Sequence, residues 1–92
     1  MSELRANISS VNREYEGWKN YVSWNVSLWI NNEYPLYQSA VAFMKTYKGK
    51  APYKNFIAKQ GLINDRTPDR IKWLSDQLDY SALNEMMREI NE

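Results

Sequence analysis

A general base in this chain has to be an Asp, Glu, Lys or Tyr side chain, because its 92 residues include no His and no Cys. The carboxylates that lie close in sequence are Asp65 with Asp69, and Asp76 with Asp79. A carboxylate pair acts as acid and base only in a cleft of suitable geometry, and the same residues suit helix starts and turns. We therefore expect no catalytic residues and a protein that is not an enzyme.

The residue types also restrict what the chain can hold. Without His and Cys, the common zinc sites and thiolate chemistry are excluded. The three glycines are isolated, and Lys48-Gly49-Lys50 lacks the glycine spacing of a loop that cradles phosphates. No carboxylates show the ligand spacing of a calcium or magnesium site. We expect neither a cofactor nor a metal ion.

A segment rich in lysine offers a different chemistry. Residues 45–59, KTYKGKAPYKNFIAK, carry five Lys and no acid, although the net charge of the whole chain is only +1. The lysines of this lysine segment are Lys45, Lys48, Lys50, Lys54 and Lys59. Together with the aromatic residues between them, they could contact phosphates and stack on bases. They could equally be solvated helix ends around core aromatic rings, since the helix dipole favours Lys at a C-terminus.

Nucleic-acid binding is the less favoured of these two interpretations. The lysine segment contains no Arg, and the overall charge is close to neutral. Modules that bind nucleic acid usually show a strongly basic balance.

Aromatic residues gather in the first half of the chain. Tyr15, Trp18, Tyr21 and Trp24 recur at every third position, so a single helix face cannot bury all four. Either Gly17 interrupts the helix or some of the rings reach the surface. We expect partner-binding residues among exposed aromatics and lysines, namely Tyr15, Trp18, Tyr34, Lys48, Lys50, Tyr53 and Lys54. The expected core residues are Trp24, Leu28, Trp29, Ile30, Ala40, Phe43 and Met44.

The elements that position these residues are predicted to be five short helices. Ser23 can cap a helix from Trp24 to about Asn32, although the alternation over Val22–Leu28 also permits a short strand. Pro35 and Pro52 suit the first turns of two helices that Gly49 and Gly61 close. A further helix is predicted to start at Thr67-Pro68-Asp69 and run to about Gln77, burying Ile71 and Leu74 with Trp73 flanking. Asp79 or Ser81 would cap the last helix, which carries Leu83, Met86, Met87 and Ile90.

The predicted architecture is an all-α orthogonal bundle in a single domain. We expect residues 1–12 to form a flexible or partly helical arm and residues 13–92 to form the helical domain. No apolar run approaches the roughly 20 residues of a spanning helix, and the polar N-terminus is no secretory signal. We therefore expect a protein of the cytoplasm without a membrane partner, monomeric or weakly self-associating.

The stretch GWKNYVSWNVSLWINNEYPLY resembles a motif of small uncharacterised proteins from bacteriophages and other mobile elements, G-W-x-N-Y-x-[ST]-W-N-V-x-L-W-I-x-N followed by an acid and L-Y. The matching positions include Gly17, Trp18, Asn20, Tyr21, Trp24, Asn25, Val26, Leu28, Trp29, Ile30, Asn32, Leu36 and Tyr37. Ser23 replaces the usual Thr, and Tyr34-Pro35 replaces a small flexible pair. Later stretches, TPD at 67–69, IKW at 71–73 and LNEM at 83–86, are also similar.

The resemblance implies an origin in a virus or mobile element, and synthesis in the cytoplasm of a host cell. It implies no activity and no catalytic residues. We expect Asn20 and Asn25 to tie buried backbone groups or helix ends together, since they stand among the fixed letters of the motif.

Three functions remain open. The leading hypothesis is a non-enzymatic module that binds and modulates a host protein, with inhibition of restriction or CRISPR defence as its most specific form. The second is a nucleic-acid accessory protein that uses the lysine segment. The third is a structural protein that self-associates through the face of the last helix that carries Met86, Met87 and Ile90.

Overall fold

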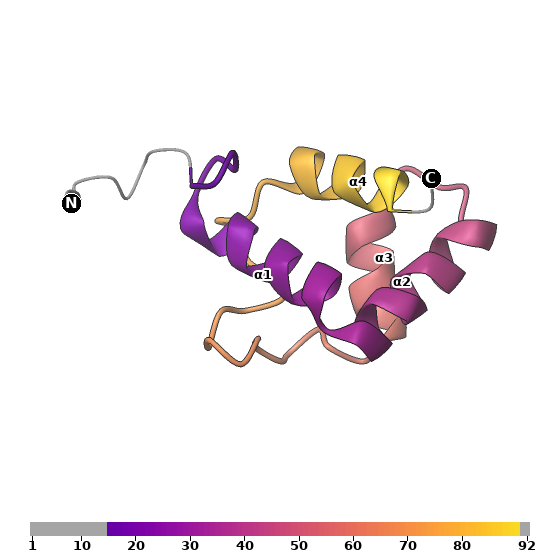
Figure 1. The fold of residues 1–92 in the computed structure, drawn as a ribbon, viewed down its shortest axis with the longest axis horizontal. Coiled ribbons are helices and arrows are strands. Elements are labelled where there is room, and N and C mark those ends of the chain that lie inside the picture. The colour runs from indigo at the N-terminus through magenta and orange to yellow at the C-terminus, as the bar shows by residue number, and fades with distance from the viewer. Residues whose placement is uncertain (1–14, 91–92) are drawn as a thin grey trace, which may run out of the picture.

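The computed structural model describes residues 15–90. The arm predicted over residues 1–12 lies outside these described residues. Within them the chain forms α1 (Tyr21–Asn32), α2 (Tyr34–Thr46), α3 (Pro52–Lys59) and α4 (Tyr80–Glu89), and no strand (Figure 1). The prediction of a single all-α globule is confirmed, with four helices instead of five.

The helices pack in two pairs that share one core. α1 packs chiefly against α2, α3 packs against α4, and α4 also contacts α1 and α2. Residues 60–79 form a long irregular segment that leaves α3, passes along α1 and returns to α4 (Figure 1). This segment therefore joins the two helices of one pair, and its contacts with α1 position most of the residues discussed below.

Local sequence explains where three of the helices begin and end. Pro35 and Pro52 stand in the first turns of α2 and α3, where a missing amide costs little. At the end of α3, Gly61 has a φ of 74°, and the amide of Leu62 donates to the carbonyl of Ile57 over 3.0 Å. This is the glycine-based helix stop that the sequence predicts. Asp79 caps α4 by accepting from the amide of Ala82, also as predicted.

The start of α1 differs from the prediction. Its cap is Asn20, whose Oδ1 accepts from the amide of Ser23 over 3.0 Å, so the helix begins three residues earlier than expected. Ser23 is buried in the first turn, and its hydroxyl accepts from the amide of Asp79 over 2.8 Å. A hydroxyl that suits a cap is therefore used for a contact between distant segments.

The helix predicted from Thr67 to Gln77 does not form. The amide of Arg70 donates to the carbonyl of Thr67, and the amide of Thr67 donates to the carbonyl of Ile71, so the chain reverses direction. Pro68 occupies the second turn position, which it also favours, and Arg70 follows with a left-handed φ of 71°. A tight turn followed by a left-handed residue is a common three-residue hairpin loop. Thr-Pro-Asp suits both a helix start and this turn, which is why the prediction was wrong.

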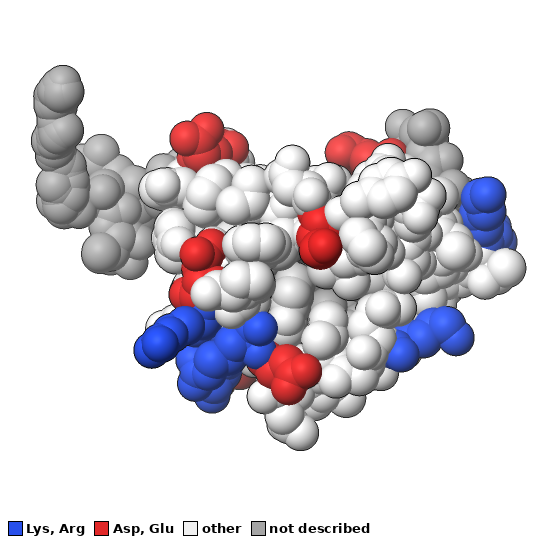
Figure 2. Space-filling model, turned by 60° about the horizontal axis from the view of Figure 1, so that its bottom comes forward, with Lys and Arg blue, Asp and Glu red and all other residues white. Residues whose placement is uncertain are grey.

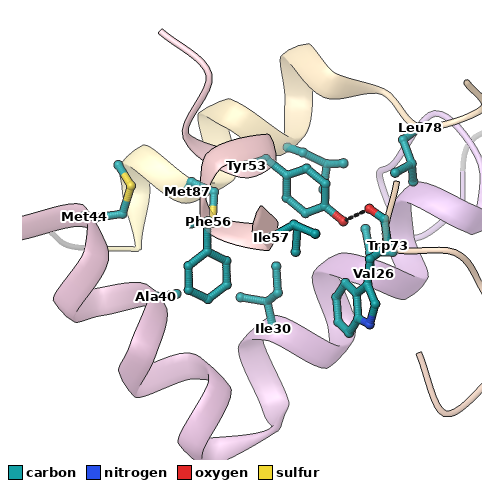
Figure 3. Packing of buried hydrophobic residues seen from close by; sticks show 11 residues of the cluster. Val26, Ile30, Ala40, Met44, Tyr53, Phe56, Ile57, Trp73, Leu78 and Met87 are labelled. Atoms are coloured by element: carbon teal, nitrogen blue, oxygen red, sulfur yellow. Dashed lines mark hydrogen bonds between the residues drawn. The ribbon is translucent and has the colours of Figure 1, made fainter. Parts of the chain in front are cut away.

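The core lies between the four helices and the irregular segment. Figure 3 shows the side chains of α3 directed at those of α1, with Phe56 beside Ala40 and Ile30. The buried hydrophobic residues are Val26, Ile30, Ala40, Met44, Tyr53, Phe56, Ile57, Trp73, Leu78, Leu83 and Met87. Ile30, Ala40 and Met44 were predicted to be core residues, and Phe43 and Trp29 pack against the core while remaining partly exposed.

Two predicted core residues lie elsewhere. Trp24 and Leu28 are half-buried, but they belong neither to the core nor to the residues packed against it. Both stand on the side of α1 opposite Val26 and Ile30, because the apolar residues of this helix occupy more than one face. The interpretation of Trp24 as core was wrong for this reason.

Candidate functional site

A network of polar side chains joins α1 to the irregular segment. Asn25, which is fully buried, donates from Nδ2 to Asp69 Oδ2 over 2.8 Å and accepts at Oδ1 from the hydroxyl of Thr67 over 2.7 Å. Trp29 Nε1 donates to the same Asp69 oxygen over 2.9 Å. The Thr67 hydroxyl also accepts from the amides of Asp69 and Ile71, over 3.2 and 3.3 Å. The network fixes the hairpin against α1.

The electrostatic effect of this network falls on Asp69. The hydrogen bonds from Asn25 and then Trp29 lower the pKa of the Asp69 carboxyl below its ordinary value of 3.8. Donors directed at a carboxylate favour its charged form. Asp69 is thus held as an anion by two side chains of α1, and its role is to hold the hairpin in place.

Other polar residues of the motif are engaged in the same way. Asn20 Nδ2 donates to the carbonyl of Gln77 over 2.8 Å, in addition to capping α1. The expectation that these Asn side chains tie backbone groups and helix ends together is confirmed for Asn20, whereas Asn25 bonds to the side chains of Tyr21, Thr67 and Asp69. Asn84 accepts from the amide of Tyr53 over 3.0 Å and so fixes the start of α3. The polar residues of the motif therefore stabilise the fold, and a functional surface has to consist of other, exposed side chains.

Tyr53 is the clearest correction among the predicted partner-binding residues. It is fully buried, and its hydroxyl donates to the carbonyl of Trp73 over 2.6 Å, as the dashed line in Figure 3 marks. Burial raises the pKa of the Tyr53 hydroxyl above its usual range. A side chain in this position contacts the core, so Tyr53 is not available to a partner.

Three aromatic side chains gather at the surface near the start of α1. Tyr15 packs on Trp24 at a centroid distance of 4.7 Å and edge-on to Tyr21 at 5.3 Å, and Tyr21 lies 5.5 Å from Trp24. Tyr15 and Tyr21 are each 40% exposed. Such offset and edge-on arrangements are the favourable ones for aromatic pairs. We call Tyr15, Tyr21 and Trp24 the aromatic patch.

A two-residue hairpin brings Tyr15 into the aromatic patch. Tyr15 and Trp18 exchange backbone hydrogen bonds around Glu16 and Gly17, whose φ values are 51° and 88°. Two successive residues with positive φ make the turn that suits a tight hairpin, and glycine at the second of them is favoured. The four rings therefore do not share one helix, since Tyr15 and Trp18 lie in the hairpin before α1, and the rings of Tyr15 and Tyr21 reach the surface.

The other predicted aromatic anchors lie apart from the patch. Trp18 is half-buried and packs against the core. Tyr34 is 68% exposed, and its hydroxyl accepts from Gln38 on the same helix over 2.8 Å. It stands beyond the far end of α1, whose 12 residues extend for about 18 Å. Tyr34 is therefore too distant to act together with the aromatic patch on a small epitope.

The lysine segment does not form one surface. Lys48 and Lys50 lie exposed in the turn between α2 and α3, and Lys54 is stacked over the ring of Tyr80 at 4.8 Å. Lys59 follows Lys54 by five residues on α3, which places the two on different sides of a helix. Neighbouring charges in sequence are thus dispersed in space, which weakens the basis for a nucleic-acid groove along this segment.

A cationic cluster that the charge pattern of the sequence does not indicate lies beside the start of α1. Arg66, Arg70 and Lys72 all line one depression of about 400 Å³ beside the start of α1, together with the half-buried Val22 and Ile71. In Figure 2 the basic side chains gather at the lower left, at the position of this hairpin, while others are scattered along the right edge. We call residues 66–72 the cationic hairpin. In the sequence, Asp65 and Asp69 offset the positive charge of this stretch, so the local charge balance does not indicate the cluster.

The remaining observations bear on the other hypotheses. Met87 is buried, and Met86 and Ile90 pack against the core, so the face of α4 that was expected to pair between copies is directed inward. Across residues 15–90 no three acidic side chains come together in a way that could hold a metal ion. Within the same range, no helix has the length and apolar character needed to cross a membrane.

Comparisons with known proteins leave the biochemical role open. One family model, described as a family of unknown function (DUF7249), matches residues 11–92. No curated protein and no solved structure matches the chain.

Proposed function

The chain belongs to DUF7249, a family of unknown function, and we propose that it is a non-enzymatic module with which a bacteriophage or other mobile element binds a protein of its host. The observation that supports this proposal is the aromatic patch. Tyr15, Tyr21 and Trp24 lie at the surface, although the packing of the core does not require them there. Aromatic side chains on a rigid element are the most frequent anchors of protein interfaces.

The rigidity of the patch favours binding. Tyr21 and Trp24 stand on the first turns of α1, which Asn20 caps and which the Asn25 network fixes to the cationic hairpin. The rings already contact one another, so they lose little conformational freedom when a partner covers them. An epitope that is ordered before association needs fewer contacts to reach a given affinity.

The origin and the host process are further parts of the proposal. The sequence motif resembles that of small proteins from bacteriophages and other mobile elements. Inhibition of a restriction or CRISPR system is the most specific version, and it depends on analogy of origin. The lysine segment supplies positive charge that would speed the approach to an acidic host surface.

The test compares capture of host proteins by the wild-type chain and by patch variants. The double variant Tyr21→Ser, Trp24→Ser removes two anchors, while Tyr34→Ser removes a more exposed ring elsewhere. We expect a bacterial protein that is captured by the wild type and by Tyr34→Ser, with at least about tenfold weaker binding to the double variant. Retention of full affinity by a folded double variant would contradict the proposal.

The host process is tested in cells. Expression of the chain in a bacterium with an active restriction or CRISPR system should raise the plating efficiency of a sensitive phage, and the double variant should abolish the rise. A wild-type chain that binds its partner but leaves defence unchanged would retain the binding function and exclude this host process.

A further inference from the structure

Arg66 and Lys72 are held side by side by the backbone of the cationic hairpin. The amide of Thr67 donates to the carbonyl of Ile71, and the amide of Trp73 donates to the carbonyl of Asp65. These two bonds flank Arg66 and Lys72, which form an antiparallel bridge without a hydrogen bond of their own. In such a pair the side chains approach each other most closely, and like charges in these positions are destabilising.

A third cation joins this pair. The guanidinium of Arg66 donates from Nη1 to the backbone carbonyl of Arg70 over 3.0 Å, which holds the Arg66 side chain beside the backbone of Arg70, and both arginines line the same depression. Within residues 15–90 the ion pair that forms is Arg88 with Glu85, on α4, so no described acid forms a direct ion pair with these three cations. Asp65 and Asp69 directly precede Arg66 and Arg70 in sequence, and the Asp69 carboxylate is engaged by α1. Asp76 also lines the depression, which leaves three cations against one carboxylate.

The hairpin is a rigid support for these charges. Thr67 is buried and bonds to Asn25 of α1 and to two amides of its own turn. The cations therefore cannot separate by a movement of the backbone without breaking the network. A concentration of like charge that the fold maintains, at an electrostatic cost, is favourable only when an anionic group enters the depression.

We propose that the depression beside the cationic hairpin is a docking site for an acidic segment of the protein partner, with Arg66, Arg70 and Lys72 receiving its carboxylates. This inference depends on the proposed function, because the depression adjoins the aromatic patch. Val22 lines the depression next to Tyr21, and the Tyr21 hydroxyl accepts from Asn25, which also binds Asp69 of the hairpin. Figure 1 places the start of α1 and this hairpin at the same end of the molecule.

The chemistry favours carboxylates over a nucleic-acid backbone. Arginine guanidinium groups bind planar carboxylates through paired hydrogen bonds, and three cations match a short acidic run. Binding to a nucleic acid usually engages more phosphates and uses open aromatic faces for stacking. Here the rings of the aromatic patch are packed against one another. The partner of this end of the molecule is therefore a protein surface with acidic and apolar parts side by side.

The experiment is an NMR titration of the isotope-labelled full chain with a short polyglutamate peptide at low salt. We expect the amide signals of residues 66–77 to shift, and the double variant Arg66→Glu, Lys72→Glu to weaken peptide binding at least about tenfold. The matched control Lys48→Glu, Lys50→Glu makes the same change in net charge, and we expect it to weaken binding less than about threefold. Equal losses for the two double variants would overturn the proposal, because only general charge would then matter.

Two further measurements keep the proposal falsifiable. Lys72→Gln should melt at the same temperature as the wild type or higher, since it removes a repulsive pair, and a clear loss of stability would show that Lys72 supports the fold instead. A single-stranded oligothymidine titrated in parallel should bind more weakly than polyglutamate. Tighter binding of the oligonucleotide to residues 66–77 would overturn the choice of a carboxylate ligand.

The outcomes for the two proposals are separable. If the captured host protein loses affinity for the Tyr21→Ser, Trp24→Ser variant but not for the Arg66→Glu, Lys72→Glu variant, host binding stands and the acidic docking site fails. If polyglutamate binds the hairpin as expected while the patch variant still captures the host protein, the aromatic anchor fails and the anion site remains.

Discussion

The two tryptophans of α1 stand five residues apart in one motif and act on opposite sides of the helix. Trp29 packs against the core and donates its indole N–H to Asp69. Trp24 contacts Tyr15 and Tyr21 at the surface and has no place in the core. Of two tryptophans in the same motif, one can therefore stabilise the fold while the other remains available to a partner.

The strongest way to break this comparison is to truncate each ring in turn. Trp29→Ala should lower the free energy of unfolding by about 2–4 kcal/mol, because it removes packing and leaves the Asp69 carboxylate one donor short. Trp24→Ala should cost about 1 kcal/mol, the scale of surface aromatic pairs. Urea denaturation followed by far-UV circular dichroism measures both. Equal costs would show that Trp24 belongs to the structural side of the helix.

The next test addresses the network that fixes α1 to the cationic hairpin. Asn25→Ala should lower the free energy of unfolding by about 2 kcal/mol, since it leaves the buried Thr67 hydroxyl without its acceptor and removes a donor from Asp69. The matched control is Asn32→Ala, whose exposed amide donates only to a carbonyl within α1. We expect the control to change stability by less than about 0.5 kcal/mol. If Asn25→Ala and Asn32→Ala lost similar free energies of unfolding in chemical denaturation, the Asn25 network would stabilise the fold no more than an exposed hydrogen bond does.

A smaller effect is expected at the hairpin that completes the aromatic patch. Gly17→Ala places a side chain on a residue with a φ of 88° and should cost about 1 kcal/mol of local stability. There is space for the added methyl group, so the cost is conformational. The near-UV circular dichroism of the patch should weaken, while the thermal midpoint changes little. An unchanged aromatic signal would mean that the hairpin does not hold Tyr15 on Trp24.

The smallest effect is a dependence on pH. The pKa of Asp69 is lower in the folded chain than its ordinary value of 3.8, so its stabilising contribution is present above that value. The contribution is lost as the pH falls through the lowered folded pKa. Asp69→Asn keeps the shape of the side chain without the charge. The difference in melting temperature between the wild type and Asp69→Asn should therefore become smaller as the pH falls. A gap that stays constant with pH would contradict the role of the charge.

The fold was predictable where the local sequence admits one conformation. Pro35, Pro52 and Gly61 mark helix ends because proline lacks an amide and glycine tolerates a positive φ, and these positions hold in the structure. The segment after Thr67 was not predictable, since its residues suit a helix start and a turn equally. The buried bond from Thr67 to Asn25, 42 positions away in sequence, fixes the turn. A contact of that separation has no local signal.

The candidate site, like the fold, was predictable from the sequence only in part. The sequence by itself determined that four rings at every third position cannot share one helix face, so that either Gly17 interrupts the helix or some of the rings reach the surface. Only the tertiary structure decided which rings those are, placing Tyr21 and Trp24 outside and Tyr53 in the core. In the folded chain the lysines of the lysine segment do not form one surface. Arg66, Arg70 and Lys72, which come from a stretch of balanced charge, line one depression. The physical reason is that spacing fixes the direction of a side chain along its own element, whereas burial and charge density depend on what the rest of the chain packs against it.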